Sequence, residues 1–320
     1  MPGSSEERGW LSEYLFHAGG IYSGACDAVL LEAVEPFVRA CQSRGRIDRW
    51  FFIRYGERGP HVRLRLHGAR EVLERDVAPA LREHLAGLYP GVAVGFPEQP
   101  PPGAGSGVSH VASVPYEPET ARYGGPEGVL LAEEFFCLSS EAALALLRGT
   151  RRDERSSRLG KALLAMVVLV HVFRGSRGDA GEFARGYGTG YLRALVPDEE
   201  RRGELTRAFG GGFEQQADTL TAYVEEAWSR LDSGDALSDA LDRYRAGLEE
   251  VRGRFGALLD AGRLCAGGAV VAEWERAVAA IVSSYVHMMN NRLGVTIQEE
   301  SYLAYLIHRS LGGAPAPAWA

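Results

Sequence analysis

The sequence lacks the features that mark membrane proteins and secreted proteins. No apolar run reaches the roughly 20 residues that a membrane helix needs, and the longest, Ala162 to Phe173, is much shorter. The first twenty residues are acidic and contain no apolar stretch of the kind found in secretory signals. We therefore expect a cytoplasmic protein with no membrane partner.

Cysteine is scarce, and the common catalytic and cofactor motifs are missing. The four cysteines are widely separated and form no CxxC pair, which argues against a disulfide framework or a cysteine metal site. There is no HExxH, GxSxG or P-loop motif. Gly103-Ala-Gly105-Ser-Gly107 follows a proline run, which is typical of a linker rather than a dinucleotide loop. We expect neither a metal nor a cofactor.

Lysine is nearly absent, since Lys161 is the only one among 35 basic residues. The 42 acidic residues give a formal charge of −7, which disfavours direct nucleic-acid binding. The 320 residues, 46% hydrophobic and 24% charged, are typical of a globular protein with a sizeable core. In so arginine-rich a chain, an arginine stands out only through its placement.

The N-terminal part of the chain is predicted to mix strands with helices. Apolar residues recur at helical spacing in segments 25–42 and 70–89. Two runs rich in aromatic and branched residues, 50–55 and 61–67, flank Gly56-Glu-Arg-Gly-Pro60, which is typical of a hairpin. Further strands are expected at 10–17, 91–96 and 108–116, and a loop is expected at 97–107.

The rest of the chain is predicted to be largely helical. Helical periodicity runs through segments 126–148, 157–174, 180–195, 199–231, 237–261, 269–293 and 297–311. The predicted fold class is α+β, with a small antiparallel sheet of about four strands in the N-terminal part, packed with a largely helical C-terminal part. We expect a single domain over residues 1–320, composed of a mixed α/β portion 1–125, a helical portion 126–311 and a flexible tail 312–320.

The first of three segments with chemical content is the predicted strand 61–67. Alternation along a strand puts His61, Arg63, Arg65 and His67 on one face and the apolar residues on the other. Neighbouring arginines on one face repel unless an anion lies between them, and guanidinium groups bind carboxylates in bidentate fashion. The same pattern also fits a half-exposed strand with a solvated polar face.

Two further segments combine acid, base and turn residues. Tyr116-Glu-Pro-Glu119-Thr-Ala-Arg122-Tyr123-Gly-Gly125 ends in glycines that permit a tight turn and close approach to a ligand, although an ordinary loop would look similar. In Tyr285-Val-His287-Met-Met-Asn-Asn291-Arg292-Leu-Gly294, His287 and Asn291 share a helix face, and Gly294 suits the helix end. We expect Arg292 to be structural, and His287 also fits a buried core residue.

Together these segments resemble the C-terminal elimination domain of the class I lantibiotic dehydratases, which also occurs alone in thiopeptide biosynthesis. The matching stretches, in the same order, are Trp50-Phe-Phe-Ile-Arg54-Tyr55 with His61-Val-Arg63-Leu-Arg65, Glu119-Thr-Ala-Arg122-Tyr123-Gly-Gly125, and His287-Met-Met-Asn-Asn291-Arg292-Leu-Gly294. The resemblance spans nearly the whole chain. The large glutamylation domain of the full-length dehydratases is not part of it, so we expect a split system.

The resemblance implies a lyase that removes glutamate from glutamylated Ser or Thr in a precursor peptide, leaving dehydroalanine or dehydrobutyrine. It implies that the catalytic residues are Arg63, Arg65, Arg122, His287 and, with weaker support, Glu119. Within the same motifs we expect His61, Arg54, Tyr123 and Asn291 to bind substrate. The expected partners are the glutamylated precursor peptide and a separate tRNA-dependent glutamylating enzyme.

Two alternatives stay open on the sequence alone. The same family includes thiopeptide pyridine synthases, which join two dehydroalanines in a formal [4+2] cycloaddition and release the leader peptide. Because all three motifs are present, elimination is favoured over that reaction. The second alternative is a non-catalytic scaffold that binds the precursor peptide and presents it to the glutamylating partner.

Overall fold

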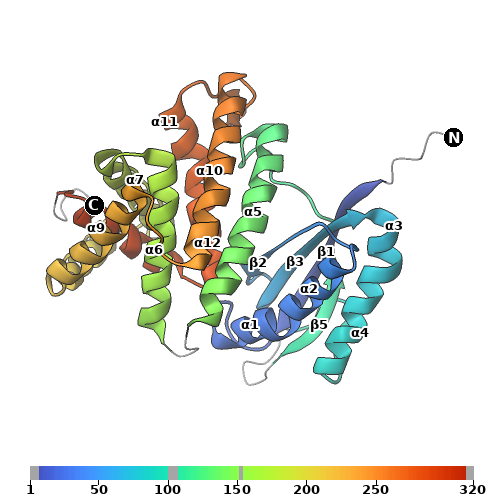
Figure 1. Cartoon of the computed structure of the whole chain (residues 1–320). Coiled ribbons are helices and arrows are strands. Elements are labelled where there is room, and N and C mark those ends of the chain that lie inside the picture. The colour runs from blue at the N-terminus through green and yellow to red at the C-terminus, as the bar shows by residue number, and fades with distance from the viewer. Residues whose placement is uncertain (1–6, 100–106, 151–153, 315–320) are drawn as a thin grey trace. The chain divides into compact units, whose positions relative to one another are not determined.

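The computed structural model describes residues 7–99, 107–150 and 154–314 (Figure 1). The chain forms two compact units. The first unit comprises residues 1–118 and 139–153, and the second comprises 119–138 and 154–320. Most of the loop predicted at 97–107 and residues 315–320 of the predicted tail lie outside the described residues.

The first unit contains a five-stranded sheet in the order β2-β3-β1-β5-β4. The strands are β1 (Arg8–His17), β2 (Arg49–Tyr55), β3 (His61–Ala69), β4 (Ala93–Val94) and β5 (Val108–Ser113). All neighbours are antiparallel except β4 and β5, which are parallel, so the sheet is mixed rather than antiparallel throughout. Without β4, the connectivity and strand order are those of the split βαβ fold.

Two helical runs connect the strands of this sheet. They are α1 (Gly24–Ala28) and α2 (Glu35–Ser43), joined by a π-helical stretch Val29–Val34, and α3 (Arg70–Val72) and α4 (Ala78–Leu88), joined by a π-helical stretch Leu73–Val77. The predicted hairpin is confirmed, since β2 and β3 pair antiparallel around the turn at Gly56. Val62, Leu64 and Leu66 of β3 are fully buried, but His61, Arg65 and His67 on the other face are buried too, so the polar face is not a solvated one.

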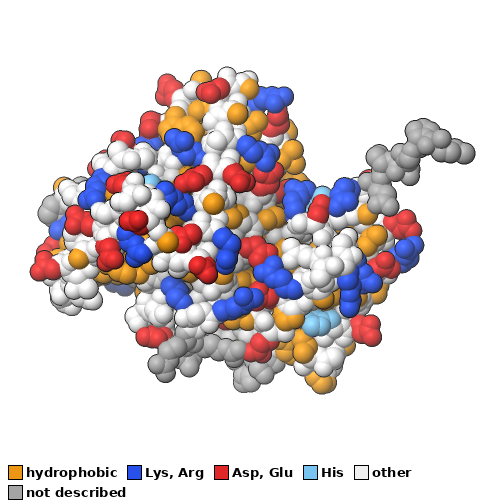
Figure 2. Space-filling view, in the orientation of Figure 1, with side chains coloured by type: hydrophobic (Ala, Val, Ile, Leu, Met, Phe, Trp, Pro, Cys, Tyr) orange, Lys and Arg blue, Asp and Glu red, His pale blue; other side chains and the backbone are white. Residues whose placement is uncertain are grey.

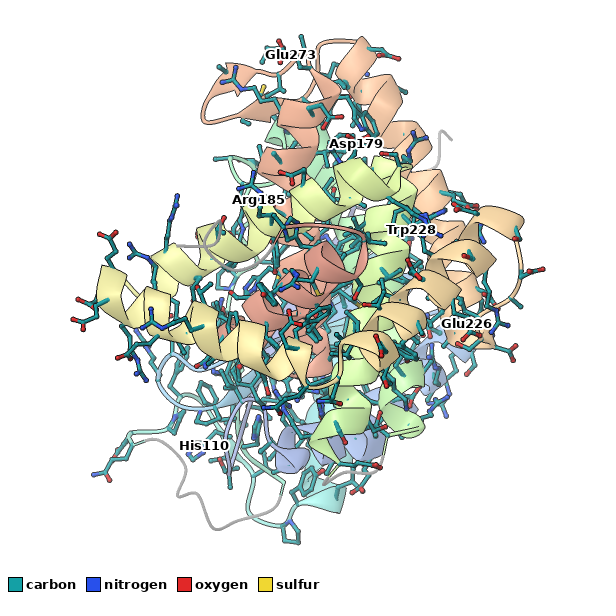
Figure 3. The ribbon with its side chains drawn as sticks, turned by 90° about the vertical axis from the view of Figure 1, so that its left-hand side faces the viewer. His110, Asp179, Arg185, Glu226, Trp228 and Glu273 are labelled. Atoms are coloured by element: carbon teal, nitrogen blue, oxygen red, sulfur yellow. The ribbon has the colours of Figure 1, made fainter. Side chains whose placement is uncertain are left out.

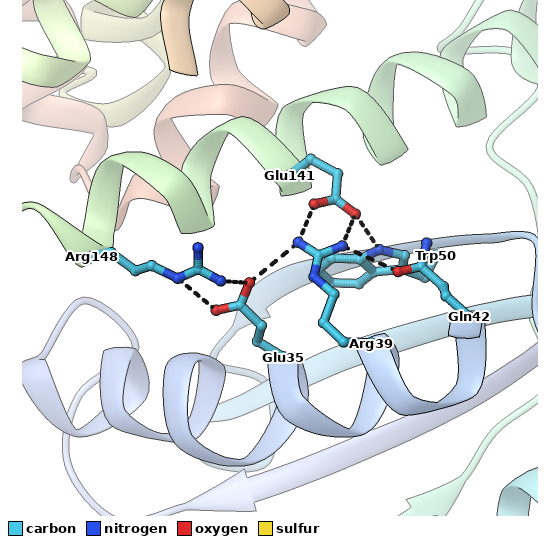
Figure 4. A network of polar contacts seen from close by, with 6 residues as sticks. All are labelled: Glu35, Arg39, Gln42, Trp50, Glu141 and Arg148. Atoms are coloured by element: carbon cyan, nitrogen blue, oxygen red, sulfur yellow. Dashed lines mark hydrogen bonds and ion pairs between the residues drawn. The ribbon is translucent and has the colours of Figure 1, made fainter. Parts of the chain in front are cut away.

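A polar network holds α2 to residues 139–148 of α5 (Gly125–Arg148) within the first unit (Figure 4). The guanidinium of Arg39 bridges the carboxylates of Glu141 and Glu35, and Arg148 donates 3.0 Å from its Nε to Glu35. The indole Nε1 of the buried Trp50 on β2 donates to Glu141 across 2.7 Å. One carboxylate therefore links a helix and a strand.

The second unit is helical apart from one short hairpin. Besides the N-terminal half of α5 it contains α6 (Arg155–Arg174), α7 (Arg177–Leu195), α8 (Glu199–Glu214), α9 (Ala217–Ser233), α10 (Asp239–Asp260), the hairpin of β6 (Cys265–Ala266) and β7 (Ala269–Val270), α11 (Trp274–Ala277), a π-helical stretch Val278–Val282, α12 (Ser283–Leu293) and α13 (Ile297–Ser310). The α+β class predicted from the sequence is thus confirmed.

Two helix predictions were wrong in detail. Segment 199–231 is two helices, because Gln216 takes a non-helical conformation (φ −136°) between α8 and α9. Segment 269–293 begins as a strand rather than a helix. Gly267 and Gly268 have positive φ values of 59° and 82°, which suit the two-residue turn between β6 and β7.

One helix, α6, is long and apolar enough to cross a membrane by length and composition. Most of its apolar window is buried inside the protein, as in the core helix of a soluble protein. The buried Trp228 of α9, labelled in Figure 3, packs edge-on against His171 of α6, with ring centroids 4.8 Å apart. The burial of α6 therefore accounts for its apolar sequence without a membrane.

Candidate functional site

The predicted site residues fall into two groups, one in each unit. Arg54, His61, Arg63 and Arg65 belong to the sheet of the first unit. Glu119, Arg122, Tyr123, His287 and Asn291 belong to the second unit. The contacts within each group determine what chemistry that group is equipped for.

Arg65 is a buried cation that lies over the ring of Tyr14, at 5.2 Å from the ring centroid, and is near the like charge of Arg63. It lies opposite Ser12 of β1 and Phe51 of β2, and only 5% of its surface is exposed. Its Nη1 donates to the carbonyl of Leu64 at 3.3 Å, while its Nε has no hydrogen-bond partner. Burial lowers the pKa of Arg65, and no carboxylate among the described residues pairs with it. A desolvated guanidinium of this kind favours an anionic ligand.

Two tyrosine rings flank the guanidinium of Arg63, two residues earlier on the same face. Its Cζ lies 4.8 Å from the ring centroid of Tyr14 and 3.4 Å from that of Tyr55. Its Nε donates to Nε2 of His61 at 3.3 Å, and Nδ1 of His61 donates to the carbonyl of Gly59 at 2.9 Å. Burial lowers the pKa of His61 to about 4, so the ring is neutral at pH 7 and orients Arg63.

Arg54 lies on the opposite face of the sheet from these arginines. It is opposite Val62 on β3, is 1% exposed, and binds the carboxylate of Asp27 at 2.6 Å. Its Nη1 also donates to the carbonyl of Ile21 at 3.3 Å. The sequence expectation that Arg54 binds substrate is not supported by this geometry, which favours a structural ion pair. The sequence motif alone did not reveal this, because Arg54 directly precedes the tyrosine that does face Arg63.

In the second unit, His287 on α12 forms a hydrogen-bonded pair with Glu300 on α13. Nδ1 of His287 lies 3.0 Å from Oε2 of Glu300, and Tyr187 on α7 donates to the same carboxylate at 2.5 Å. Burial raises the pKa of Glu300, while the hydrogen bonds from His287 and Tyr187 lower it. We assign the hydrogen to Nδ1, because a carboxylate only accepts hydrogen bonds, and this assignment leaves the lone pair on Nε2. No described residue hydrogen-bonds that Nε2 atom.

A second tyrosine of α7 links His287 to Arg122. The ring of Tyr191 stacks on that of His287 with centroids 5.2 Å apart. Burial raises the pKa of Tyr191 to about 12, and a hydrogen bond with Arg122 acts in the opposite direction. Arg122 also donates from Nε to the hydroxyl of Ser284 at 3.1 Å and contacts Glu119 at 3.4 Å. The second unit therefore brings Arg122, Glu119 and His287 into one connected set.

The turn that carries Arg122 is held close to α5. The backbone N–H of Arg122 donates to the carbonyl of Glu119 at 3.0 Å. Gly124 and Gly125 have positive φ values of 96° and 88°, so the predicted tight glycine turn is confirmed. A Cβ atom on Gly128, in the first turn of α5, would lie 2.3 Å from the carbonyl oxygen of Tyr123. The turn can approach the helix only because residue 128 has no side chain.

The other predicted residues of the second unit lie in its core. Tyr123 is 2% exposed and packs edge-on against Phe136, and burial raises its pKa to about 12. Asn291, one turn after His287, is 6% exposed. Arg292 is fully buried and donates to the carbonyl of Met288 at 2.9 Å, while Gly294 ends α12 with φ 70°. These contacts match the structural role expected for Arg292.

Four further residues of this set, Glu300, Tyr187, Tyr191 and Ser284, were not predicted from the sequence. Tyr187 and Tyr191 are four residues apart on α7, and that spacing was the one available signal that they share a face. Glu300 follows Glu299, which forms a capping box with Thr296 at the start of α13, so its burial was not visible. Across the described ranges, no group of three or more His, Cys, Asp or Glu side chains could hold a metal ion.

Known structures with a similar fold include a pyridine synthase and a lantibiotic dehydratase. The crystal structure of TsrL has a TM-score of 0.68 and 18% identity, covering 95% of this chain and 94% of TsrL. The pyridine synthase TbtD from thiomuracin biosynthesis has a TM-score of 0.68 and 21% identity, covering 95% and 98%. The tRNA-dependent lantibiotic dehydratase MibB from Microbispora sp. 107891 has a TM-score of 0.56 and 22% identity, covering 97% of this chain and 28% of MibB.

A search of curated proteins finds no match to this sequence. The family model for the C-terminal domain of lantibiotic biosynthesis dehydratases, in contrast, matches residues 10–311. That match includes every predicted site residue in both units. The chain therefore belongs to the lantibiotic biosynthesis dehydratase C-terminal domain family.

Proposed function

We propose that this protein is a lyase that eliminates glutamate from glutamylated Ser or Thr residues of a ribosomal precursor peptide, leaving dehydroalanine or dehydrobutyrine. The observation that carries the proposal is Arg65, a buried guanidinium with an unpartnered Nε and no carboxylate to neutralise it. Elimination generates a carboxylate as its leaving group, which is the ligand that such a cation lacks.

The reaction requires a base, an anion site and stabilisation of charge on the peptide. We assign the base to Nε2 of His287, which takes the Cα proton; the electron pair forms the Cα=Cβ bond, and the Cβ–O bond breaks to release glutamate. A positioned base contributes on the order of 10²–10⁴ in rate. Within the first unit we assign carboxylate binding to Arg63 and Arg65. Within the second unit we assign stabilisation of charge on the amide oxygen to Arg122, at roughly 10²–10³ for each such donor. Glu119 orients Arg122, and Glu300 and Tyr187 fix the His287 ring.

Mass spectrometry of a glutamylated precursor peptide tests this proposal directly. The wild-type protein is expected to convert the peptide to its dehydrated form with release of one glutamate per modified residue. His287→Ala and Arg122→Ala are expected to leave the glutamyl adduct in place. Undiminished release by either variant, with folding verified by circular dichroism, would contradict the assignment of that residue.

A pyridine synthase is the second candidate, favoured by the TM-score of 0.68 to TbtD against 0.56 to MibB. The products separate the two reactions. An elimination enzyme releases glutamate and does not cleave the peptide. A pyridine synthase instead yields a macrocycle and a released leader peptide. A scaffold without activity would bind the precursor tightly and be indifferent to alanine at Arg65 or His287.

The expected partners are the glutamylated peptide and a separate tRNA-dependent glutamylating enzyme. The net charge of −7 gives this chain no general affinity for tRNA. In the face drawn in Figure 2, acidic and basic side chains are intermixed. We therefore assign tRNA binding to the partner and the elimination step, in the cytoplasm, to this chain.

A further inference from the structure

A small cavity of about 190 Å³ lies beside Arg63 in the first unit. Its lining consists of Tyr14, Phe16, Glu57, Arg58, His61, Arg63, Phe96 and Val114. At ~30 Å³ per molecule it has room for roughly six waters, well below the ~300–1,000 Å³ of pockets that enclose a drug-sized ligand. It therefore fits one small charged group and not a folded peptide segment.

The charges on its wall are two guanidinium groups and one carboxylate. Arg58 lies over the ring of Phe96, 5.0 Å from its centroid, and has no ion pair among the described residues. Oε2 of Glu57 is 3.7 Å from Nη2 of Arg63, which is too long for a hydrogen bond. The Glu57 side chain is 65% exposed, so its carboxylate remains accessible to a ligand despite that contact. Both signs of charge are thus available to a ligand.

The turn between β2 and β3 holds these charges in an uncommon backbone conformation. Arg58 has φ 61°, and across the described ranges it is the one non-glycine residue with positive φ. The N–H of Gly59 closes the turn by donating to the carbonyl of Gly56 at 3.1 Å. Gly or Asn would fit this position with less strain. A bulky residue kept in such a conformation at a cavity points to a functional role.

We infer that Glu57 and Arg58 form a recognition element for the acyl group on the peptide, reading the ammonium and the free carboxylate of a glutamyl ester respectively. Arg63 contributes to the same carboxylate, and the exposed ring of Phe96 contacts the methylene groups. This inference rests on the proposed elimination and adds to it the two residues, Glu57 and Arg58, that distinguish the glutamyl group from similar acyl groups.

Three peptide esters that differ only in the acyl group test this inference. A glutamyl ester carries both charges, a glutaminyl ester lacks the free carboxylate, and a glutaryl ester lacks the ammonium. The kcat/KM for release of each acid is measured with wild type, Arg58→Asn and Glu57→Gln. Asn tolerates positive φ, so Arg58→Asn removes the guanidinium while keeping the turn. Arg44→Asn, at an exposed position away from the cavity, is the matched control.

The expected result is a crossed pattern. Arg58→Asn reduces the preference for glutamyl over glutaminyl by roughly ten- to a hundredfold and keeps the preference over glutaryl. Glu57→Gln reduces the preference for glutamyl over glutaryl and keeps the preference over glutaminyl. Arg44→Asn changes neither ratio. A hairpin that is merely damaged would slow all three substrates in parallel. Unchanged ratios in both variants of an active enzyme would overturn the inference while leaving the proposed elimination intact.

Calorimetry with free glutamate and free glutamine gives a reading that does not depend on turnover. Wild type is expected to bind glutamate more tightly than glutamine, and Arg58→Asn to reduce that difference. If wild type releases no acid from any ester, the proposed elimination fails. Equal binding of the two amino acids by wild type would separately contradict the recognition element.

Discussion

His287 donates its Nδ1 hydrogen to the buried carboxylate of Glu300 across 3.0 Å. This bond fixes one tautomer and leaves the Nε2 lone pair for the substrate proton. We expect Glu300→Gln to lower the single-turnover rate of glutamate release by on the order of 10²–10⁴-fold, because a neutral amide no longer stabilises the imidazolium that forms. The measurement is quenched-flow release of glutamate from the glutamylated peptide.

The neighbouring residue provides a control for this prediction. Glu299 accepts from the backbone N–H of Thr296 at 2.8 Å and from Nε of Arg155 at 2.7 Å, with no contact to His287. Glu299→Gln should therefore lower the melting temperature, through a weakened helix cap of about 0.5–2 kcal/mol, and leave the release rate near that of wild type. A wild-type rate in Glu300→Gln would contradict the role assigned to Glu300.

The two buried arginines of the sheet are expected to respond in opposite ways to the same substitution. Arg65→Met removes a desolvated cation that has no carboxylate partner, so the free energy of unfolding should stay level or rise, while glutamate release falls by roughly 10²-fold or more. Arg54→Met leaves Asp27 as an uncompensated buried charge and should cost about 3–5 kcal/mol. Urea unfolding and glutamate release, measured on both variants, check this contrast. Loss of stability in Arg65→Met would argue for a structural role.

The lowered pKa of His61 predicts a specific dependence of the free energy of unfolding on pH. Burial lowers its pKa to about 4 from the ordinary 6.5, so between these values the unfolded chain binds a proton that the folded chain does not. Its contribution to stability is fully present above about pH 6.5 and is lost as the pH falls toward 4, by up to ~3 kcal/mol. His61→Gln should flatten the fall in unfolding free energy in this window. Above pH 7 the two proteins should have the same slope, and a difference confined to that range would contradict the prediction.

The network around Glu141 gives a prediction about stability alone. Glu141→Ala leaves the indole N–H of the buried Trp50 without its acceptor, which should cost about 1–3 kcal/mol. The ion pair with Arg39 adds little, since both side chains are more than a third exposed. In a double-mutant cycle, Glu141→Ala should cost much less stability in the Trp50→Phe background than in wild type. The reason is that phenylalanine has no N–H donor to leave unsatisfied. Additive effects of the two substitutions would contradict this account.

Periodicity predicted the α+β class and the alternation of His61, Arg63 and Arg65 on β3, because both follow from local spacing. The parallel pairing of β4 with β5 was not predictable, since Ala93–Val94 is too short to carry a pattern. The β6–β7 hairpin was missed because its four strand residues are followed by a long helical run. The Gly267–Gly268 pair was the signal that should have prompted a turn.

Some residues of the candidate site were predictable from local sequence and others were not. Arg63, Arg65, Arg122 and His287 were found because they lie in dense local motifs. Glu300 and Tyr187 could not be found that way. The partner of Glu300 is His287, 13 residues away along the chain, and the partner of Tyr187 is Glu300, 113 residues away. Only tertiary packing brings α7, α12 and α13 together.

Gly128 is needed for the position of the Arg122 turn, although it has no side chain that could touch the substrate. An added methyl group would collide with the carbonyl oxygen of Tyr123, next to Arg122 in the turn. A substitution there would displace the guanidinium without altering any charged or polar side chain. Genetic variation at this inert position is therefore expected to mimic loss of Arg122 itself, and chemical character alone would not identify it as harmful.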